Sequence, residues 1–156
     1  MVQASTTLCA FDKRQVLKIT WLQRGHVIKE MGALLSGTQN ILAALSNDDM
    51  AAVAEYARSL GMGMTVKAED HLQGALPKDF MSLGISVYHD FEKIAADAQS
   101  NKDPKHTLQQ LSQAMSKCVA CDATYQMRTA KNIQNLPISP STLNTNILHY
   151  YANRIA

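Results

Sequence analysis

The chain has 156 residues, of which 46% are hydrophobic and 18% are charged, and its formal net charge is +2. This size and composition are typical of one folded domain with a real core, and they argue against a disordered chain. Lysines and arginines are scattered among acids rather than gathered in a block, so nucleic acid is not expected as the main partner. No apolar run reaches the ~20 residues that a membrane-spanning helix needs.

The first strong pattern is a helical period over residues 17–46, where apolar side chains recur every three or four positions. Glycines at 25, 32 and 37 weaken this helix by up to ~1 kcal/mol each, which leaves a break near Gly25 as one alternative. The predicted stripe along one face consists of Leu17, Trp21, Arg24, Ile28, Met31, Leu35, Thr38, Leu42 and Leu45.

Three further helical patterns follow, over roughly residues 48–60, 77–100 and 104–132. Gly61 is placed as a C-terminal cap for the second helix, and Pro77 suits the first turn of the third. Residues 137–156 form a C-terminal tail with a small amphipathic pattern, for which a short helix is one interpretation.

Four amphipathic helices joined by mostly short connections predict an all-α fold, an antiparallel four-helix bundle over residues 1–136 with a short C-terminal extension. Each apolar stripe can be buried only against the other helices, and we expect this burial to supply most of the stability. We see no strand period of note.

The fourth helical pattern carries the most informative motif, Cys118-Val119-Ala120-Cys121-Asp122. Two cysteines at this spacing followed by His are typical of c-type haem attachment, in which each thiol takes one vinyl group and the His binds the iron. Here Asp122 stands where the His belongs. On a helix, Cys118 and Asp122 lie near the centre of the apolar stripe, and Cys121 lies on its flank.

With this motif on the last of four helices, the chain resembles the cytochrome c′ family over roughly residues 22–132. Tyr125 and Arg128 follow the cysteines as an aromatic and a basic residue do in that family, and residues 24–31 resemble the family's first helix. The resemblance implies a periplasmic protein that forms a dimer through its first helices and takes part in gas binding or electron transfer.

The resemblance also implies roles for individual residues. Cys118 and Cys121 match the two thioether positions, and Arg24 matches the residue that reaches a haem propionate. The haem face opposite the axial ligand would lie near one of two apolar residues, Ile28 or Met31.

Asp122 is the departure from the family pattern. The attachment machinery recognises the complete motif including His, and a carboxylate is a poor iron ligand for such a centre, so covalent haem is not expected. We therefore predict a non-enzymatic protein that binds a small apolar ligand, a metal ion or a protein partner. The alternative is a haem-binding cytochrome with an atypical axial ligand or none.

The Cys118/Cys121 pair has several interpretations, namely haem attachment, a redox disulfide, half of a metal site, or two inert cysteines left from a haem site. Positions i and i+3 of a helix set the Cβ atoms slightly too far apart for a relaxed disulfide. Cys9 is the unpaired third cysteine, either free or bonded between chains. Thiol redox catalysis remains the enzymatic alternative.

Asp122 on an apolar stripe needs a partner or access to water, and Arg24 is the candidate partner. Soft copper ligands are one interpretation of the eight methionines, although Met31, Met50 and Met115 lie on apolar stripes and are expected in the core. His26 and Glu30 are four residues apart and could share a metal ion on one helix face, with surface histidines as the alternative.

The first residues, Met1 to Ser5, lack the charged end and apolar stretch of a secretory leader. The sequence alone therefore indicates either a cytosolic protein or one whose leader has been removed. The resemblance favours the second reading and a periplasmic location.

Overall fold

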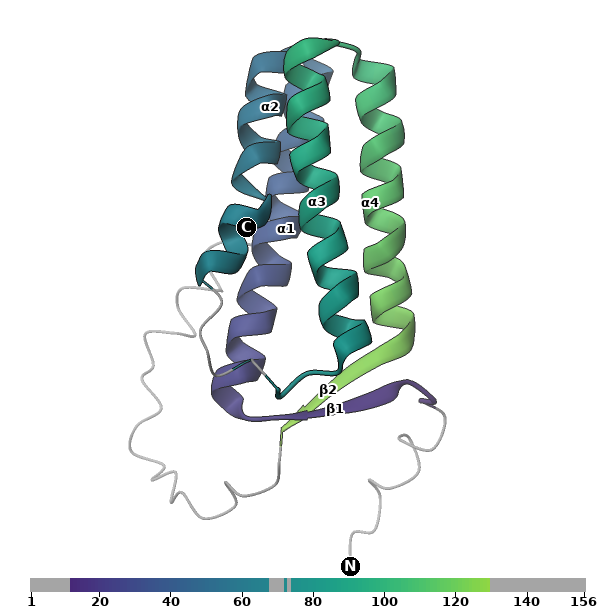
Figure 1. Ribbon diagram of the computed structural model, residues 1–156. Helices are drawn as coiled ribbons and strands as arrows, with labels where there is room; N and C mark the ends of the chain where they lie inside the picture. The colour runs from purple at the N-terminus through teal and green to yellow at the C-terminus, as the bar shows by residue number, and fades with distance from the viewer. Residues whose placement is uncertain (1–11, 68–71, 73, 130–156) are drawn as a thin grey trace, which may run out of the picture.

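The computed structural model describes residues 12–67, 72 and 74–129. These residues are mainly helical, with four α-helices that stand side by side and a two-stranded sheet at one end of them (Figure 1). The sequence prediction of a mainly helical protein with four helices is confirmed, whereas the sheet was not expected. In chain order the elements are β1 (Gln15–Ile19), α1 (Trp21–Ser46), α2 (Met50–Ser59), the 3₁₀-helix η2 (Met62–Lys67), α3 (Lys78–Ser100), α4 (Pro104–Thr124) and β2 (Tyr125–Thr129).

Helix α1 begins at Trp21, and the prediction of a helix from residue 17 was wrong. Thr20 caps α1, because its side chain accepts a hydrogen bond from the Gln23 amide while the Gln23 side chain accepts one from the Thr20 amide. Before this cap the chain is extended, and Leu17 and Ile19 alternate with exposed neighbours. Helix α1 continues through Gly25 without a break.

Helix α4 ends at Thr124, and the prediction of a helix through residue 132 was wrong over residues 125–129, which form β2. β1 and β2 are parallel, with Gln15 opposite Tyr125 and Ile19 opposite Thr129. Strands of five residues are too short to show a clear period in sequence, and β1 and β2 lie more than 100 residues apart in the chain. The sequence pattern therefore did not predict this sheet. Residues 130–132 and the tail at 137–156 lie outside the described residues.

Local signals explain the other helix ends. Asp49 accepts a hydrogen bond from the Ala52 amide at the start of α2, and Asp103 accepts two from the first turn of α4. Pro77 precedes α3 as its N-cap instead of occupying its first turn. Leu60 takes the C-cap position of α2 that was expected for Gly61.

The four helices do not pack equally on one another. Helix α1 packs closely on α2, α2 on α3 and α3 on α4, whereas α1 and α4 approach each other less closely and are linked by a hydrogen bond from the Thr38 hydroxyl to the Met115 sulfur. We call the gap between α1 and α4 the seam. The sheet joins its two sides at one end, because β1 leads into α1 and β2 follows α4 (Figure 1).

Two groups of buried apolar side chains hold the fold together. The main core lies among all four helices and is made of Ile41, Ala44, Leu45, Met50, Val53, Ala54, Ala57, Leu60, Val87, Phe91, Ile94, Ala95, Ala98 and Leu111. The sheet cluster is smaller and is made of Leu17, Ile19, Val27, Leu72 and Leu76. Phe80 and Tyr125 pack against the sheet cluster, with their rings edge to face and their centroids 5.2 Å apart.

Candidate functional site

A cavity of about 650 Å³ lies between the main core and the sheet cluster, where α1, α3 and α4 face one another. Its wall is mostly apolar and takes residues from both groups of buried side chains. The cavity is lined by Val27, Ile28, Glu30, Met31, Gly32, Leu34, Leu35, Thr38, Leu72, Leu76, Phe80, Met81, Leu83, Gly84, Ile85, Val87, Tyr88, Phe91, Met115, Lys117, Cys118, Cys121 and Asp122.

The cavity explains why the middle part of the predicted stripe of α1 is not buried. Ile28, Met31 and Leu35 line the cavity and are 42%, 41% and 65% exposed. Trp21 and Leu42 of the same stripe are also exposed. The buried residues of α1 are Val27, Gly37, Thr38, Ile41, Ala44 and Leu45, of which Thr38 and Leu45 belong to the predicted stripe. Periodicity identified an apolar face correctly but could not show that α4 leaves this face uncovered.

Cys118 and Cys121 lie in the last two turns of α4, and both line the cavity. Both are free thiols and half-buried. Burial raises the pKa of each thiol, and the nearby Asp122 carboxylate raises it further because it opposes a second negative charge. These thiols are therefore protonated and weakly nucleophilic near neutral pH. Cys9 lies outside the described residues.

Glu30 of α1 and Tyr88 of α3 bring polar groups to the cavity wall. Tyr88 is buried, and this burial together with the neighbouring Glu30 raises the pKa of its phenol to about 12. The phenol thus remains a hydrogen-bond donor at any physiological pH. Near them, Lys117 forms an ion pair with Asp90 and donates a hydrogen bond to the Ser86 carbonyl oxygen.

A second hollow of about 460 Å³ adjoins the cavity at the sheet end, and we call it the vestibule. Four residues line both hollows, namely Met31, Phe80, Cys121 and Asp122. The other residues that line the vestibule are Asp12, Arg14, Leu17, Arg24, Tyr125, Gln126, Met127 and Arg128. The vestibule therefore has three arginines on its wall, whereas the wall of the cavity is mostly apolar.

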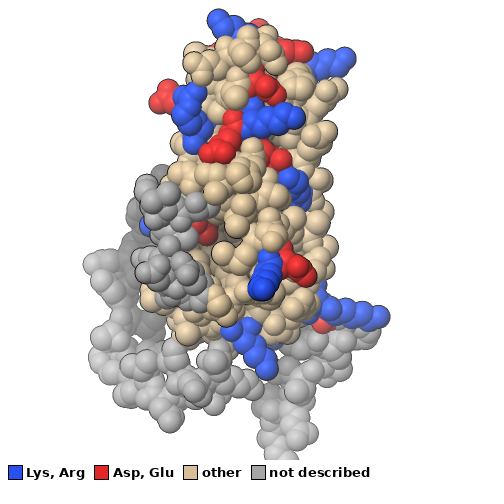
Figure 2. All heavy atoms as spheres, in the orientation of Figure 1, with Lys and Arg blue, Asp and Glu red and all other residues tan. Residues whose placement is uncertain are grey.

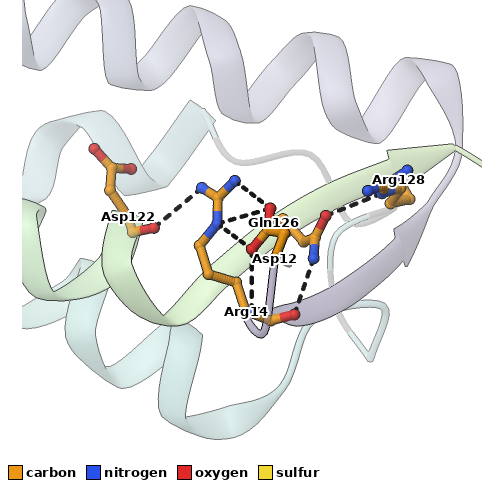
Figure 3. Close-up of polar contacts among 5 residues, drawn as sticks. All are labelled: Asp12, Arg14, Asp122, Gln126 and Arg128. Carbon is orange, nitrogen blue, oxygen red and sulfur yellow. Dashed lines mark hydrogen bonds and ion pairs between the residues drawn. The ribbon is translucent and has the colours of Figure 1, made fainter. Parts of the chain in front are cut away.

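Hydrogen bonds organise one side of the vestibule (Figure 3). Arg14 forms an ion pair with Asp12 at 2.7 Å and donates a hydrogen bond to the main-chain oxygen of Asp122 at 3.2 Å. The Arg14 guanidinium holds the pKa of Asp12 at about 2. Arg128 donates to Gln126, whose amide donates to the Arg14 carbonyl oxygen. Arg14 was missed by sequence reasoning, because no motif marks a single arginine just before a short strand.

Arg24 and Asp122 both line the vestibule, but the structure does not join them in an ion pair, so the predicted partnership was wrong. The Arg24 guanidinium lies over the Trp21 ring, 5.9 Å from its centroid. Asp122 is exposed, which agrees with the other expectation for this carboxylate, access to water.

The predicted metal candidates lie near one another on α1. His26 Nε2 is 3.5 Å from Glu30 Oε1, and both side chains are mostly buried. Within residues 12–67, 72 and 74–129, no group of three or more His, Cys, Asp or Glu side chains is placed to hold a metal ion. His71 and His149 lie outside this part of the chain.

The methionines divide between the core and the cavity. Met50 is buried in the main core, as expected, and Met64 packs against it. Met31 and Met115 line the cavity, so the prediction that they belong to the core was wrong, and Met81 lines it as well.

Comparisons with known proteins do not identify a relative. No family model matches the chain, and neither a curated protein nor a solved structure shows significant similarity to it. Among the helices that the structure describes, none is both long enough and apolar enough to cross a membrane. On the face seen in Figure 2, acidic and basic side chains are interspersed, with no large area of a single sign.

Proposed function

We propose that this chain is a binding protein whose cavity takes a small apolar ligand, on a scaffold of the cytochrome c′ type that no longer attaches haem covalently. The scaffold in this proposal is an antiparallel four-helix bundle, and the protein acts in the periplasm without catalysing a reaction. The observation that carries the proposal is the apolar cavity beside Cys118, Cys121 and Asp122.

The volume and chemistry of the cavity support this function. Small-molecule sites in proteins have volumes of roughly 300–1,000 Å³, apolar walls and a few polar groups that orient the ligand. The cavity volume of about 650 Å³ falls in this range, and Tyr88 and Glu30 supply polar groups. Leu35 on its wall is 65% exposed, so the hollow is open to a ligand from solvent.

The vestibule favours a ligand that also carries an anionic group. The Arg24 guanidinium lies over the Trp21 ring and lines the vestibule. A carboxylate there would form a charge-assisted hydrogen bond with the guanidinium. This is the role that the family resemblance implies for Arg24 toward a haem propionate.

The thiol pair does not favour redox catalysis. Reactive Cys-x-x-Cys thiols lie at helix N-termini and have lowered pKa values. Cys118 and Cys121 lie near the end of α4, and the pKa of each is raised by burial. The thiol redox enzyme is therefore the less favoured alternative.

The proposal is tested by binding of an apolar fluorescent dye to the purified chain, with two matched variants. Gly84 lines the cavity, Gly25 does not, and an added Cβ meets no atom within 4 Å at either position. We expect Gly84→Leu to abolish dye binding by filling the cavity and Gly25→Leu to leave it unchanged. Both variants should keep the helical circular dichroism spectrum. Equal dye binding by both variants would contradict the proposal.

A second candidate is a haem-binding protein, because Ile28, Met31, Cys118 and Cys121 all line the cavity beside Asp122. Expression with haem-maturation genes tests it. A Soret band and covalent porphyrin in the wild-type protein would favour this candidate over the first. Asp122→His should restore some attachment, and a colourless Asp122→His protein would mean that the cavity does not accept the macrocycle.

The resemblance also predicts a homodimer through the first helices. Trp21, Ile28, Leu35 and Leu42 are exposed and lie seven residues apart, a spacing that aligns them along one edge of α1. Sedimentation measures the mass directly. We expect a dimer for the wild type and a monomer for a Trp21→Glu/Leu42→Glu variant, since these two side chains do not line the cavity.

A further inference from the structure

Five sulfur-bearing side chains line the cavity from three helices. Cys118, Cys121 and Met115 belong to α4, Met31 to α1 and Met81 to α3. Thiolates and thioethers are soft ligands, and they select soft ions such as Cu(I). These five sulfur atoms share the mostly apolar wall with the polar side chains of Glu30, Thr38, Tyr88, Lys117 and Asp122.

The spacing of the two thiols suits one metal ion better than a disulfide. Residues i and i+3 of a helix have Cβ atoms ~5–6 Å apart, whereas a relaxed disulfide requires ~3.5–4.5 Å. Two metal–sulfur bonds of ~2.3 Å each can join sulfur atoms up to ~4.6 Å apart. An ion held between Cys118 and Cys121 therefore leaves α4 undistorted.

We propose that the cavity holds one Cu(I) ion between the thiolates of Cys118 and Cys121, with the thioether of Met31 as a third ligand from α1. Met31 is assigned this role because it lines both the cavity and the vestibule, as Cys121 does. As each sulfur bonds the metal, its proton passes to solvent, and copper keeps its oxidation state. The two thiolates and Cu(I) together carry one negative charge.

The surroundings of the site suit this charge and this ion. Three arginines and two aspartates line the vestibule, which leaves one positive charge in excess beside Cys121. A divalent cation that prefers three or four His, Cys or carboxylate ligands finds no such group within the described residues. This inference rests on the proposed function only in that the cavity must be open to ligands.

Anaerobic titration of the full-length chain with Cu(I) from a chromophoric chelator tests the proposal. We expect one equivalent to transfer to the wild type. In the Cys118→Ser/Cys121→Ser variant, the affinity for Cu(I) should fall by more than ~10–100-fold. A loss of ~10–100-fold is typical when a residue that only supports a metal ligand is removed. Met31→Leu should weaken binding by less than the cysteine changes. Met50→Leu in the main core and Cys9→Ser should leave both affinity and stoichiometry unchanged.

A measurement on the wild type covers the case in which the serine variant does not fold. One equivalent of Ag(I), a redox-inert ion of similar softness, should protect Cys118 and Cys121 from alkylation, as mapped by peptide mass spectrometry. Absence of Cu(I) transfer or of protection would overturn the copper site, as would unchanged Cu(I) affinity in a folded serine variant. If the dye still binds in that case, the proposed function stands and only the copper site fails. Failure of dye binding alone would count against the apolar ligand and leave the copper site standing.

Discussion

The main core is built from all four helices and the cavity from three of them, α1, α3 and α4, and the two regions differ in how completely the helices cover one another. In the main core, α2 packs closely on both α1 and α3, and Ile41, Val53 and Ile94 have no exposed surface. At the cavity, α1 and α4 separate, and Ile28 and Leu35 remain open although both are apolar. The comparison teaches that one helix can supply stability over half of its length and a ligand-accessible wall over the other half.

Two isoleucines of α1 sharpen this comparison most strongly. Ile41 is fully buried in the main core, and Ile28 lines the cavity and is 42% exposed. We expect Ile41→Ala to lower the free energy of unfolding by ~2–5 kcal/mol, because it removes packed methyl groups and leaves a void. Ile28→Ala should cost less than ~1 kcal/mol, since its contacts are already incomplete. Urea unfolding followed by circular dichroism measures both, and similar losses would mean that the cavity is closed in solution.

Two glycines should respond with opposite signs. A Cβ added at Gly84 meets no atom within 4 Å, whereas one at Gly37 overlaps the side chain of Leu60, which is buried in the main core. Gly84→Ala should stabilise the protein by ~0.5–1 kcal/mol through helix propensity alone. Gly37→Ala gains the same propensity but must repack Leu60, an overpacking cost of ~1–3 kcal/mol. Thermal unfolding of the two variants measures both effects. A higher unfolding temperature for Gly37→Ala would show that the main core has room for the added methyl group beside Leu60.

The smallest effect concerns Asp97, which ties α3 to α4 at the end remote from the sheet. Its carboxylate accepts hydrogen bonds from His106 at 3.2 Å and Gln110 at 2.6 Å, and these bonds lower its pKa below the ordinary value of 3.8. The stabilisation is therefore present above pH 3.8 and is lost as the pH falls through the lowered pKa. Asp97→Asn should unfold at lower urea concentration than wild type at pH 7, and the gap should close as the pH falls through the lowered pKa of Asp97. Glu55→Gln, an exposed change on α2, should show no such pH-dependent gap.

Local patterns predicted the helices better than they predicted the site. Val87, Phe91 and Ile94 are buried on α3 as their period indicates, because the neighbours of α3 cover that face. Ile28 and Leu35 of α1 follow the same helical period in sequence, but they line the cavity and stay exposed. No local pattern can reveal that a neighbouring helix leaves them uncovered. The expectation that Ile28 or Met31 lies near the two cysteines came from a resemblance and not from periodicity, and in the structure all four side chains line the cavity. The resemblance could not anticipate Arg14, whose position depends on β1.

The parallel pairing of β1 with β2 also bears on how the protein folds. Gln15 pairs with Tyr125, so this contact closes a segment of about 110 residues, and loops of that length form slowly. During synthesis β1 leaves the ribosome long before its partner strand exists. We therefore expect the helices to assemble first and strand pairing to come last. Amide hydrogens of residues 15–19 and 125–129 should then exchange with solvent before those of α2 and α3.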